Sequence, residues 1–153
     1  MSQTPLQQVL EVAVVLLNAY CFGANCVERF VNYQTWSLVP ADAFQAYHRA
    51  QQPLIQAFVV APMLVGFALQ IGLAVWPPSG IDPRVVWVMA AASAVGAACT
   101  AMLQLPIHRK FNQRGFSPEL LGKLLHTDWI RKAADVVRLA ATVIFLHRLL
   151  SAC

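Results

Sequence analysis

The sequence has 153 residues, enough for one domain, with 58% hydrophobic residues, 12% charged residues and a mean hydropathy of +0.56. Soluble domains average roughly 45–50% apolar and about 25% charged residues, so this composition excludes an ordinary soluble domain, a disordered chain and a disulfide scaffold. The net charge of +4 suits basic loops at a membrane surface, and we expect no nucleic-acid partner.

Four apolar segments reach or approach the length of about 20 residues that a membrane-spanning helix needs. They cover residues 6–27, 54–76, 85–105 and 133–150. The run Pro77-Pro78-Ser79-Gly80 ends the second segment, and Pro106 is expected to end the third.

Short amphipathic helices are expected to start at Pro40-Ala41-Asp42, running directly into the second segment, and at Ser117-Pro118-Glu119. The sequence therefore predicts an all-α fold. We expect this fold to be an integral membrane four-helix antiparallel bundle, one domain over residues 1–153, with short amphipathic helices on the cytoplasmic side.

Lys and Arg are distributed unequally between the two ends of this predicted bundle. The connections after the first and third segments hold eight of them: Arg29, Arg49, Arg109, Lys110, Arg114, Lys123, Arg131 and Lys132. The opposite end holds only Arg84 and Arg148. Because cytoplasmic loops carry an excess of Lys and Arg, we expect both termini outside the cytoplasm, in a bacterial inner membrane. Trp76 and Trp87 are expected at the outer membrane interface, and Trp36 and Trp129 at the inner one.

Polar side chains recur at helical spacing toward the cytoplasmic end of each segment. The four sets are Asn18, Cys21, Asn25, Glu28 and Asn32; His48, Gln52 and Gln56; Thr100, Gln104 and His108; and Asp128, Arg131, Asp135 and Arg138. Charges inside a membrane face the bundle interior and pair. We therefore expect Asp128 to pair with Arg131, and Arg138 with Asp135 or with Glu28 across the bundle. These pairs would fix the register of the first and fourth helices, and they are also compatible with a binding pocket.

His48 and His108 are the candidates for acid–base chemistry, because histidine titrates near neutral pH. Arg131 and Arg138 would stabilise an oxyanion, with Asp128 beside them. The candidate catalytic residues are thus His48, His108, Asp128, Arg131 and Arg138, and the candidate pocket residues are Asn25, Glu28, Gln52 and Gln104.

A metal site is the less favoured interpretation of these histidines. His48 and His108 with Glu28 or Asp128 would form a two-His, one-carboxylate set, but their spacing matches no established metal motif and we expect no metal. No cofactor is indicated. His147 is expected to pair with Glu11 near the outer end, and the small residues around Gly96 are expected to allow close helix packing, or alternatively to leave a thin wall beside a flat ligand.

A family resemblance comes from the stretch between the third and fourth segments. Its residues are Leu105-Pro106-Ile107-His108-Arg109-Lys110-Phe111, then Asp128-Trp129-Ile130-Arg131, then Arg138. This stretch resembles the anthrone-oxygenase-like family of small four-helix membrane proteins, in which Asn is usual at the position of Asp128 and an aromatic residue is common at that of Asp135. The resemblance implies a four-span fold and, for some members, oxygenation of anthrones to anthraquinones.

Two functions are compatible with these observations. The first is a membrane oxidoreductase-like or ligand-binding protein, whose cytoplasm-facing polar pocket takes a flat lipophilic molecule of quinol or anthrone type. The alternative is a non-catalytic accessory subunit that stabilises a larger membrane complex. The expected partners are the lipid bilayer, a lipophilic small molecule, and other membrane subunits or a second copy of the chain.

Overall fold

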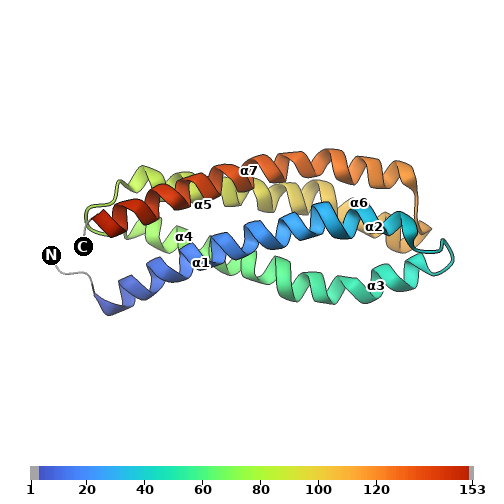
Figure 1. The fold of residues 1–153 in the computed structure, drawn as a ribbon, viewed down its shortest axis with the longest axis horizontal. Coiled ribbons are helices and arrows are strands. Elements are labelled where there is room, and N and C mark those ends of the chain that lie inside the picture. The colour runs from blue at the N-terminus through green and yellow to red at the C-terminus, as the bar shows by residue number, and fades with distance from the viewer. Residues whose placement is uncertain (1–3, 152–153) are drawn as a thin grey trace.

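The computed structural model describes residues 4–151, and all of its regular structure is helical (Figure 1). The elements in chain order are α1 (Pro5–Val27), η1 (Glu28–Asn32), α2 (Tyr33–Thr35), η2 (Trp36–Leu38), α3 (Phe44–Ile55), η3 (Gln56–Val60), α4 (Ala61–Val75), α5 (Pro83–Cys99), η4 (Thr100–Gln104), α6 (Leu105–Arg114) and α7 (Pro118–Ser151). Segments η1, η3 and η4 are π-helical, and η2 is a 3₁₀ turn.

Consecutive elements merge into four long helical stretches, which run up and down the molecule (Figure 1). The first three are Pro5–Leu38, Phe44–Val75 and Pro83–Arg114, and each is long and apolar enough to cross a membrane. The fourth, α7, has 34 residues but carries Asp135, Arg138 and Arg148 in its apolar part. The predicted all-α class is thus confirmed, with four long helices of which three are candidate membrane spans within residues 4–151.

Local sequence explains where the helices start. Thr4 caps α1 by accepting a hydrogen bond from the Gln7 amide at 3.3 Å, and Asp82 caps α5 by accepting from the Arg84 amide at 2.9 Å. Each cap is followed by a proline at the first helical position, where a missing N–H costs nothing. Gly115 separates α6 from α7 with a φ of +79°, a conformation that glycine adopts without strain.

Two expectations about the helix boundaries were wrong. Ser117-Pro118-Glu119 does not start a separate amphipathic helix, because α7 runs without a break from Pro118 to Ser151. Pro106 does not end the third helix, which continues through η4 into α6 as far as Arg114.

The π-helical segments explain how prolines fit inside these helices. A proline clashes with the carbonyl four residues before it, which is Phe58 for Pro62 and Met102 for Pro106. Both carbonyls lie inside π-helical segments, η3 and η4, where the backbone is wider. The Phe58 carbonyl accepts a 2.7 Å hydrogen bond from the Tyr20 hydroxyl of α1 instead.

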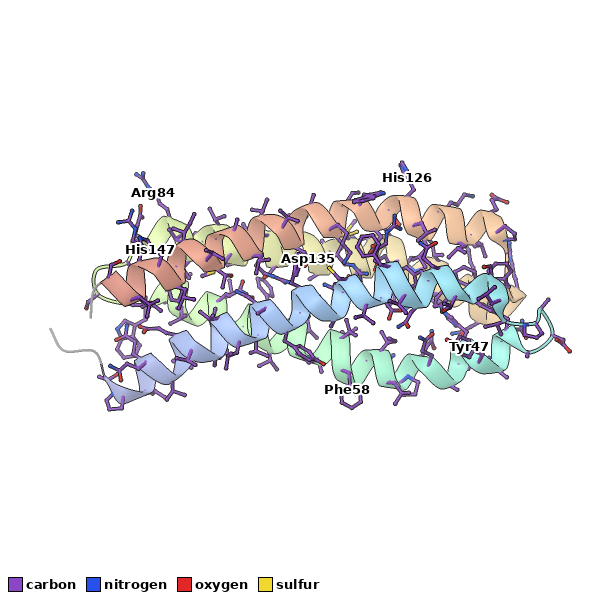
Figure 2. All side chains as sticks on the ribbon, in the orientation of Figure 1. Tyr47, Phe58, Arg84, His126, Asp135 and His147 are labelled. Carbon is purple, nitrogen blue, oxygen red and sulfur yellow. The ribbon has the colours of Figure 1, made fainter. Side chains whose placement is uncertain are left out.

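The bundle core is apolar toward both ends and polar between them. Near the chain termini, Val14, Met89 and Phe145 belong to one apolar cluster, and at the opposite end Trp36, Phe44 and Phe111 belong to a second. Asp135 lies in the polar interior, whereas His126 and Arg84 point away from the bundle (Figure 2). Trp36 is only 1% exposed, so its side chain packs in the protein interior and not against lipid headgroups.

Candidate functional site

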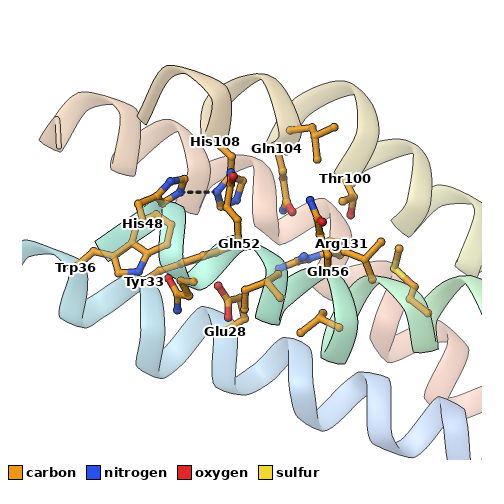
Figure 3. Close-up of a pocket in the computed structure, with 16 residues that line it drawn as sticks. Glu28, Tyr33, Trp36, His48, Gln52, Gln56, Thr100, Gln104, His108 and Arg131 are labelled. Atoms are coloured by element: carbon orange, nitrogen blue, oxygen red, sulfur yellow. Dashed lines mark hydrogen bonds between the residues drawn. The ribbon is translucent and has the colours of Figure 1, made fainter. Parts of the chain in front are cut away.

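A cavity of about 80 Å³ lies where the ends of all four long helices meet (Figure 3). Its apolar wall includes Tyr33, Trp36, Ile55 and Met63. Its polar side chains come from η1, α3, η3, η4, α6 and α7, and they are Glu28, His48, Gln51, Gln52, Gln56, Thr100, Gln104, His108 and Arg131. Residues far apart in the sequence therefore share one small chamber.

Two histidines form part of a hydrogen-bond chain at this cavity. The Asn112 side-chain amide donates to Gln52 Oε1 at 3.0 Å, which turns the Asn112 Oδ1 atom toward His48 Nδ1 at 2.6 Å. His48 Nδ1 must then be the donor, which leaves the Nε2 atom of a neutral His48 as an acceptor. His108 Nδ1 lies 3.0 Å from that atom and donates to it.

This chain fixes the tautomer of His108, whose ring lines the cavity. With Nδ1 carrying the proton, Nε2 of the neutral ring keeps a free lone pair. None of the hydrogen bonds among the described residues uses this Nε2 atom. The cavity is thus provided with an acceptor of the kind that acts as a general base.

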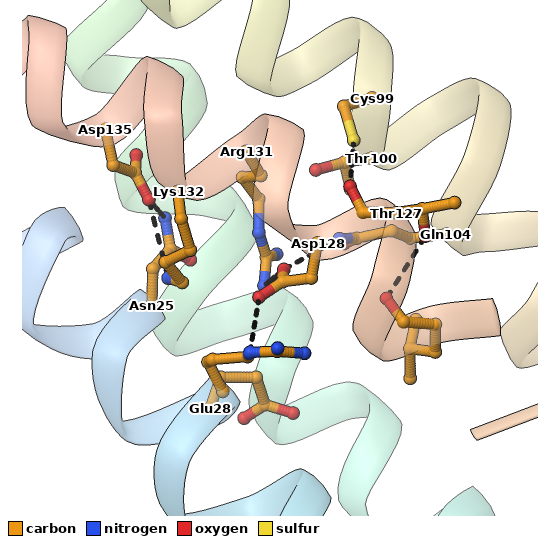
Figure 4. A network of polar contacts seen from close by, with 12 residues as sticks. Asn25, Glu28, Cys99, Thr100, Gln104, Thr127, Asp128, Arg131, Lys132 and Asp135 are labelled. Atoms are coloured by element: carbon orange, nitrogen blue, oxygen red, sulfur yellow. Dashed lines mark hydrogen bonds and ion pairs between the residues drawn. The ribbon is translucent and has the colours of Figure 1, made fainter. Parts of the chain in front are cut away.

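Arg131 brings positive charge to the same cavity. Arg131 is 4% exposed, and its Nη2 atom lies 2.6 Å from Asp128 Oδ1 (Figure 4). The Nε atom has no hydrogen-bond partner among the described residues. An unsatisfied buried donor is costly, and a ligand oxygen in the cavity would satisfy it.

Asp128 lies behind Arg131 and is fully buried. It also accepts a 2.9 Å hydrogen bond from the Gln104 amide and lies 3.7 Å from Arg29 Nε. Arg29 in turn donates to the Leu125 carbonyl at 2.7 Å and stacks over the Trp129 ring. Asp128 therefore orients Arg131 and ties α7 to η1 and η4.

A second ion-pair group lies further along α7. Asp135 pairs with Arg138 at 2.8 Å and with Lys132 at 3.6 Å, and it accepts a 3.0 Å hydrogen bond from Asn25 of α1. The expected Asp128–Arg131 and Asp135–Arg138 pairs are both confirmed. The predicted alternative, in which Glu28 pairs with Arg138, is not found; Glu28 instead accepts a 2.6 Å hydrogen bond from Asn32.

The buried charges in this half of the bundle do not cancel. Four cationic side chains (Arg29, Arg131, Lys132 and Arg138) face three carboxylates (Glu28, Asp128 and Asp135). Buried charges in a bundle interior are normally paired. The excess positive charge lies in the Asp135 group, where Arg138 and Lys132 face one carboxylate. At the cavity, Arg29 and Arg131 are balanced by Glu28 and Asp128.

All three π-helical segments contribute to the cavity wall: η1 through Glu28, η3 through Gln56, and η4 through Thr100 and Gln104. Residues in π-helices make up well under 1% of soluble proteins, and π-helical turns are frequent at functional sites. Their convergence marks this cavity as the most specialised part of the described chain.

The structure separates the predicted site residues into two groups. His48, His108, Arg131, Glu28, Gln52 and Gln104 all line the cavity. Asp128 contacts two lining residues, Arg131 and Gln104, without lining the cavity itself. Asn25 and Arg138 belong to the Asp135 group outside the cavity. Helical spacing correctly placed each set on an inward face. It could not distinguish the residues that line the cavity from those of the Asp135 group, which lie at a different position along the bundle axis.

Several residues at the site were missed. Asn112 follows His108 by four residues and so extends the predicted stripe, a signal that was present in the sequence. Tyr33 and Trp36 gave no such signal, because their burial depends on how the chain turns after η1. Arg29 and Lys132 were assigned to loops, but both are buried as partners of aspartates.

Two other expectations concern metal binding and Glu11. Within residues 4–151, no group of three or more His, Cys, Asp or Glu side chains is arranged to hold a metal ion. His147 is exposed, whereas Glu11 is buried, with its Oε1 atom unpaired within the described residues. The expected Glu11–His147 pair is therefore wrong.

Comparison with known proteins gave no match, whether to a family model, to a curated protein or to a solved structure. The function of this chain therefore has to be argued from its own cavity, and the anthrone-oxygenase-like resemblance stays a hypothesis that rests on its motif residues.

Proposed function

We propose that the central cavity binds the oxygen-bearing ring of a flat lipophilic molecule of quinol or anthrone type. One observation carries this proposal: Arg131, whose Nε–H is unpaired within the described residues, and His108, which offers an acceptor, line the same chamber. A phenol-type hydroxyl needs both kinds of partner, because its hydrogen donates while its oxygen accepts.

The same two residues support an acid–base step. His108 Nε2 takes the hydroxyl proton, and Arg131 stabilises the oxyanion that remains. Ring oxygens that have lost a proton are easier to oxidise. In its catalytic form the proposal is an oxidoreductase with dioxygen as co-substrate. A quinol would pass two electrons and two protons to dioxygen, giving a quinone and hydrogen peroxide. An anthrone would take one oxygen atom as its new carbonyl while the other leaves as water, and only this second reaction is oxygenase-like. In its binding form the proposal stops at recognition of the ring.

The membrane setting follows from the exposed side chains. The charged residues in the middle of α7, from Asp128 to Arg138, are buried. Val136, Val137, Val143 and Ile144 are exposed, as expected of a helix whose outer face touches lipid. We propose that α7 is the fourth span.

The proposed orientation places the cavity near the cytoplasmic side. Five exposed Lys and Arg residues lie around that end, namely Arg49, Arg109, Lys110, Arg114 and Lys123, against Arg84 and Arg148 at the other. Arg29, Arg131 and Lys132 are buried and no longer count among the eight Lys and Arg residues that the sequence assigned to this end. The remaining excess of exposed Lys and Arg still favours cytoplasmic loops at the cavity end.

Binding of a small ring compound tests the proposal. The probe is 2,3-dimethoxy-5-methyl-1,4-hydroquinone, titrated without oxygen into the detergent-solubilised chain by calorimetry. His108→Asn keeps a donor at the position of Nδ1, and so the bond to His48, but removes Nε2. We expect the affinity of this variant for the hydroquinone to fall at least about tenfold, which corresponds to a loss of about 1.4 kcal/mol in binding free energy.

The matched control is His126→Asn, which changes an exposed histidine outside the cavity. It should bind like the unmodified chain. Equal binding by His108→Asn, or no binding of the hydroquinone by any form, would contradict the proposal.

A further inference from the structure

A groove lies beside the central cavity, on the outer surface between α1 and η3. Its volume is about 480 Å³, and its walls include Tyr20, Gly23 and Val27 from α1 and Phe58 and Val59 from η3. Val27 and Phe58 are largely exposed, and Phe58 stands out from the bundle (Figure 2). In a membrane, this groove faces the lipid chains.

The groove and the cavity adjoin. Glu28, Ile55 and Val59 line both of them and therefore form the shared wall, so a ligand that occupied both spaces would pass between these three side chains. The chemistry changes across this boundary: the cavity holds the polar groups of His108 and Arg131, whereas the groove is lined mainly by apolar side chains.

Two features keep the groove open. The Tyr20 hydroxyl donates to the Phe58 carbonyl at 2.7 Å and bridges α1 to η3 at the end away from Glu28. Gly23 lies between them, and a Cβ atom added there would meet nothing within 4 Å. From Tyr20 to Glu28 the helix rises ~12 Å, which sets the length of the open stretch.

The two volumes differ in a way that specifies the ligand. A chamber of about 80 Å³ is far smaller than the roughly 300–1,000 Å³ typical of pockets for drug-sized ligands, whereas the groove of about 480 Å³ falls within that range. The chamber holds a ring, but the greater part of a larger molecule has to lie elsewhere.

We propose that the ligand is an amphiphile, with its oxygen-bearing ring in the central cavity and a long apolar chain in the groove, and that it enters sideways from the bilayer. This inference rests on the proposed function and narrows its ligand to rings that carry an apolar tail. The occupant of the groove is the tail of the bound ligand itself.

The test compares two probes on three proteins. The probes are the hydroquinone named above and its 6-decyl derivative, titrated at one fixed detergent concentration. The proteins are the unmodified chain, Gly23→Leu, which fills the groove, and Gly72→Leu, which adds the same side chain at an exposed α4 glycine with equally open surroundings. Because partition of the tail into micelles is the same for all three proteins, their differences report the groove.

We expect the decyl chain to increase affinity at least about tenfold for the unmodified chain and for Gly72→Leu. Gly23→Leu should lose that increase and still bind the tail-less ring normally. A decyl probe with a terminal diazirine should, after illumination, label peptides that contain residues 19–27 or 55–60.

The possible failures are distinguishable. An equal tail effect in all three proteins, or labelling confined to other peptides, overturns this inference and means that ordinary lipid chains fill the groove, while the ring site stands. Absence of binding for both probes overturns the ring site and the tail inference together.

Discussion

His108 Nδ1 lies 3.0 Å from His48 Nε2, and the two imidazole rings are nearly parallel, with an interplanar angle of 19° and centroids 5.3 Å apart. This contact joins α6 to α3 across 60 positions of sequence. Trp36 packs edge-on against both rings, which prevents either from turning. The pair is therefore a rigid unit with assigned proton positions, not two independent titrating side chains.

The first prediction concerns proton movement through this pair. His48→Gln places an amide oxygen where His48 Nε2 accepted from His108, so that hydrogen bond can be kept. The glutamine has no donor that replaces His48 Nδ1, so the hydrogen bond to Asn112 is lost and the hydrogen-bond chain toward Gln52 is interrupted. We expect stability to fall by about 0.5–1.5 kcal/mol, the value of one hydrogen bond, and ring binding to persist. If the chain is catalytic, turnover should fall about 10²-fold or more at nearly unchanged affinity.

Oxygen consumption and quinone absorbance measure that turnover, and a melting curve measures stability. Loss of ring binding in His48→Gln would show that His48 acts in recognition, against its place behind His108.

The second prediction separates the scaffold from the site. Arg138→Ala leaves Asp135 buried with only Lys132 and Asn25 as partners, so the free energy of unfolding should fall by about 1–3 kcal/mol. Arg138→Lys should recover only part of this loss, because an ammonium cannot replace the planar guanidinium. Ring affinity, measured by calorimetry, should stay unchanged in both variants because Arg138 does not line the cavity. A tenfold loss of affinity would place Arg138 in the site after all.

Helix positions and inward faces could be predicted from the sequence because a membrane helix leaves a long apolar run and its buried polar residues follow the helical period. The Asp128–Arg131 and Asp135–Arg138 pairs were predictable for the same reason, since residues three apart are neighbours on a helix.

Features that depend on contacts between helices could not be predicted. Proline at position 106 normally ends a helix, and nothing in the sequence indicates that the π-helical segment η4 accommodates it. Trp36 looks like an interface residue by type, and only the packing of Phe44, Phe111 and His108 around it places it in the core. The polar residues form two groups along the bundle, one around Arg131 and one around Asp135, and only the first lines a cavity. Which group leaves space depends on how the helices pack, and the spacing of residues along the sequence does not reveal it.

The third prediction concerns two buried carboxylates with opposite surroundings. Glu11 makes no ion pair or hydrogen bond within the described residues, whereas Asp135 pairs with two cations. Glu11→Gln should leave stability unchanged or higher. Asp135→Asn should lower it by about 3–5 kcal/mol, since it leaves buried positive charge uncompensated. Thermal unfolding of the two variants in one detergent checks this, and a comparable loss for Glu11→Gln would reveal a partner for Glu11.

The fourth prediction concerns orientation. Ser79 and Gln113 are exposed at opposite ends of the bundle, Ser79 between α4 and α5 and Gln113 near the end of α6. In a background where Cys153 is replaced by serine, Ser79→Cys should react with an impermeant maleimide on intact cells. Gln113→Cys should react only after lysis, because the basic end is expected in the cytoplasm. The opposite labelling pattern would reverse the proposed orientation.

The last prediction distinguishes a ligand-binding protein from an accessory subunit. The accessory-subunit hypothesis relied on close helix packing at the small residues of α5, yet a Cβ atom at Gly96 would meet nothing within 4 Å. Gly96→Ala should therefore be tolerated, and its higher helix propensity should stabilise the chain by about 0.5–1 kcal/mol.

The α5 residues that remain available to a partner helix are the exposed Ala91, Ala94 and Ala98, which share one outward face. Ala94→Leu would obstruct close approach of such a helix without touching the cavity. For a ligand-binding protein, ring affinity and elution volume in detergent should both match those of the unmodified chain. For an accessory subunit, Ala94→Leu should dissociate the complex, whereas His108→Asn should leave it intact. Because His108, with its acceptor atom, and Arg131, with its unpaired Nε donor, line the same cavity, we expect the ligand-binding outcome. His108→Asn should be the damaging change, and Ala94→Leu should have no effect.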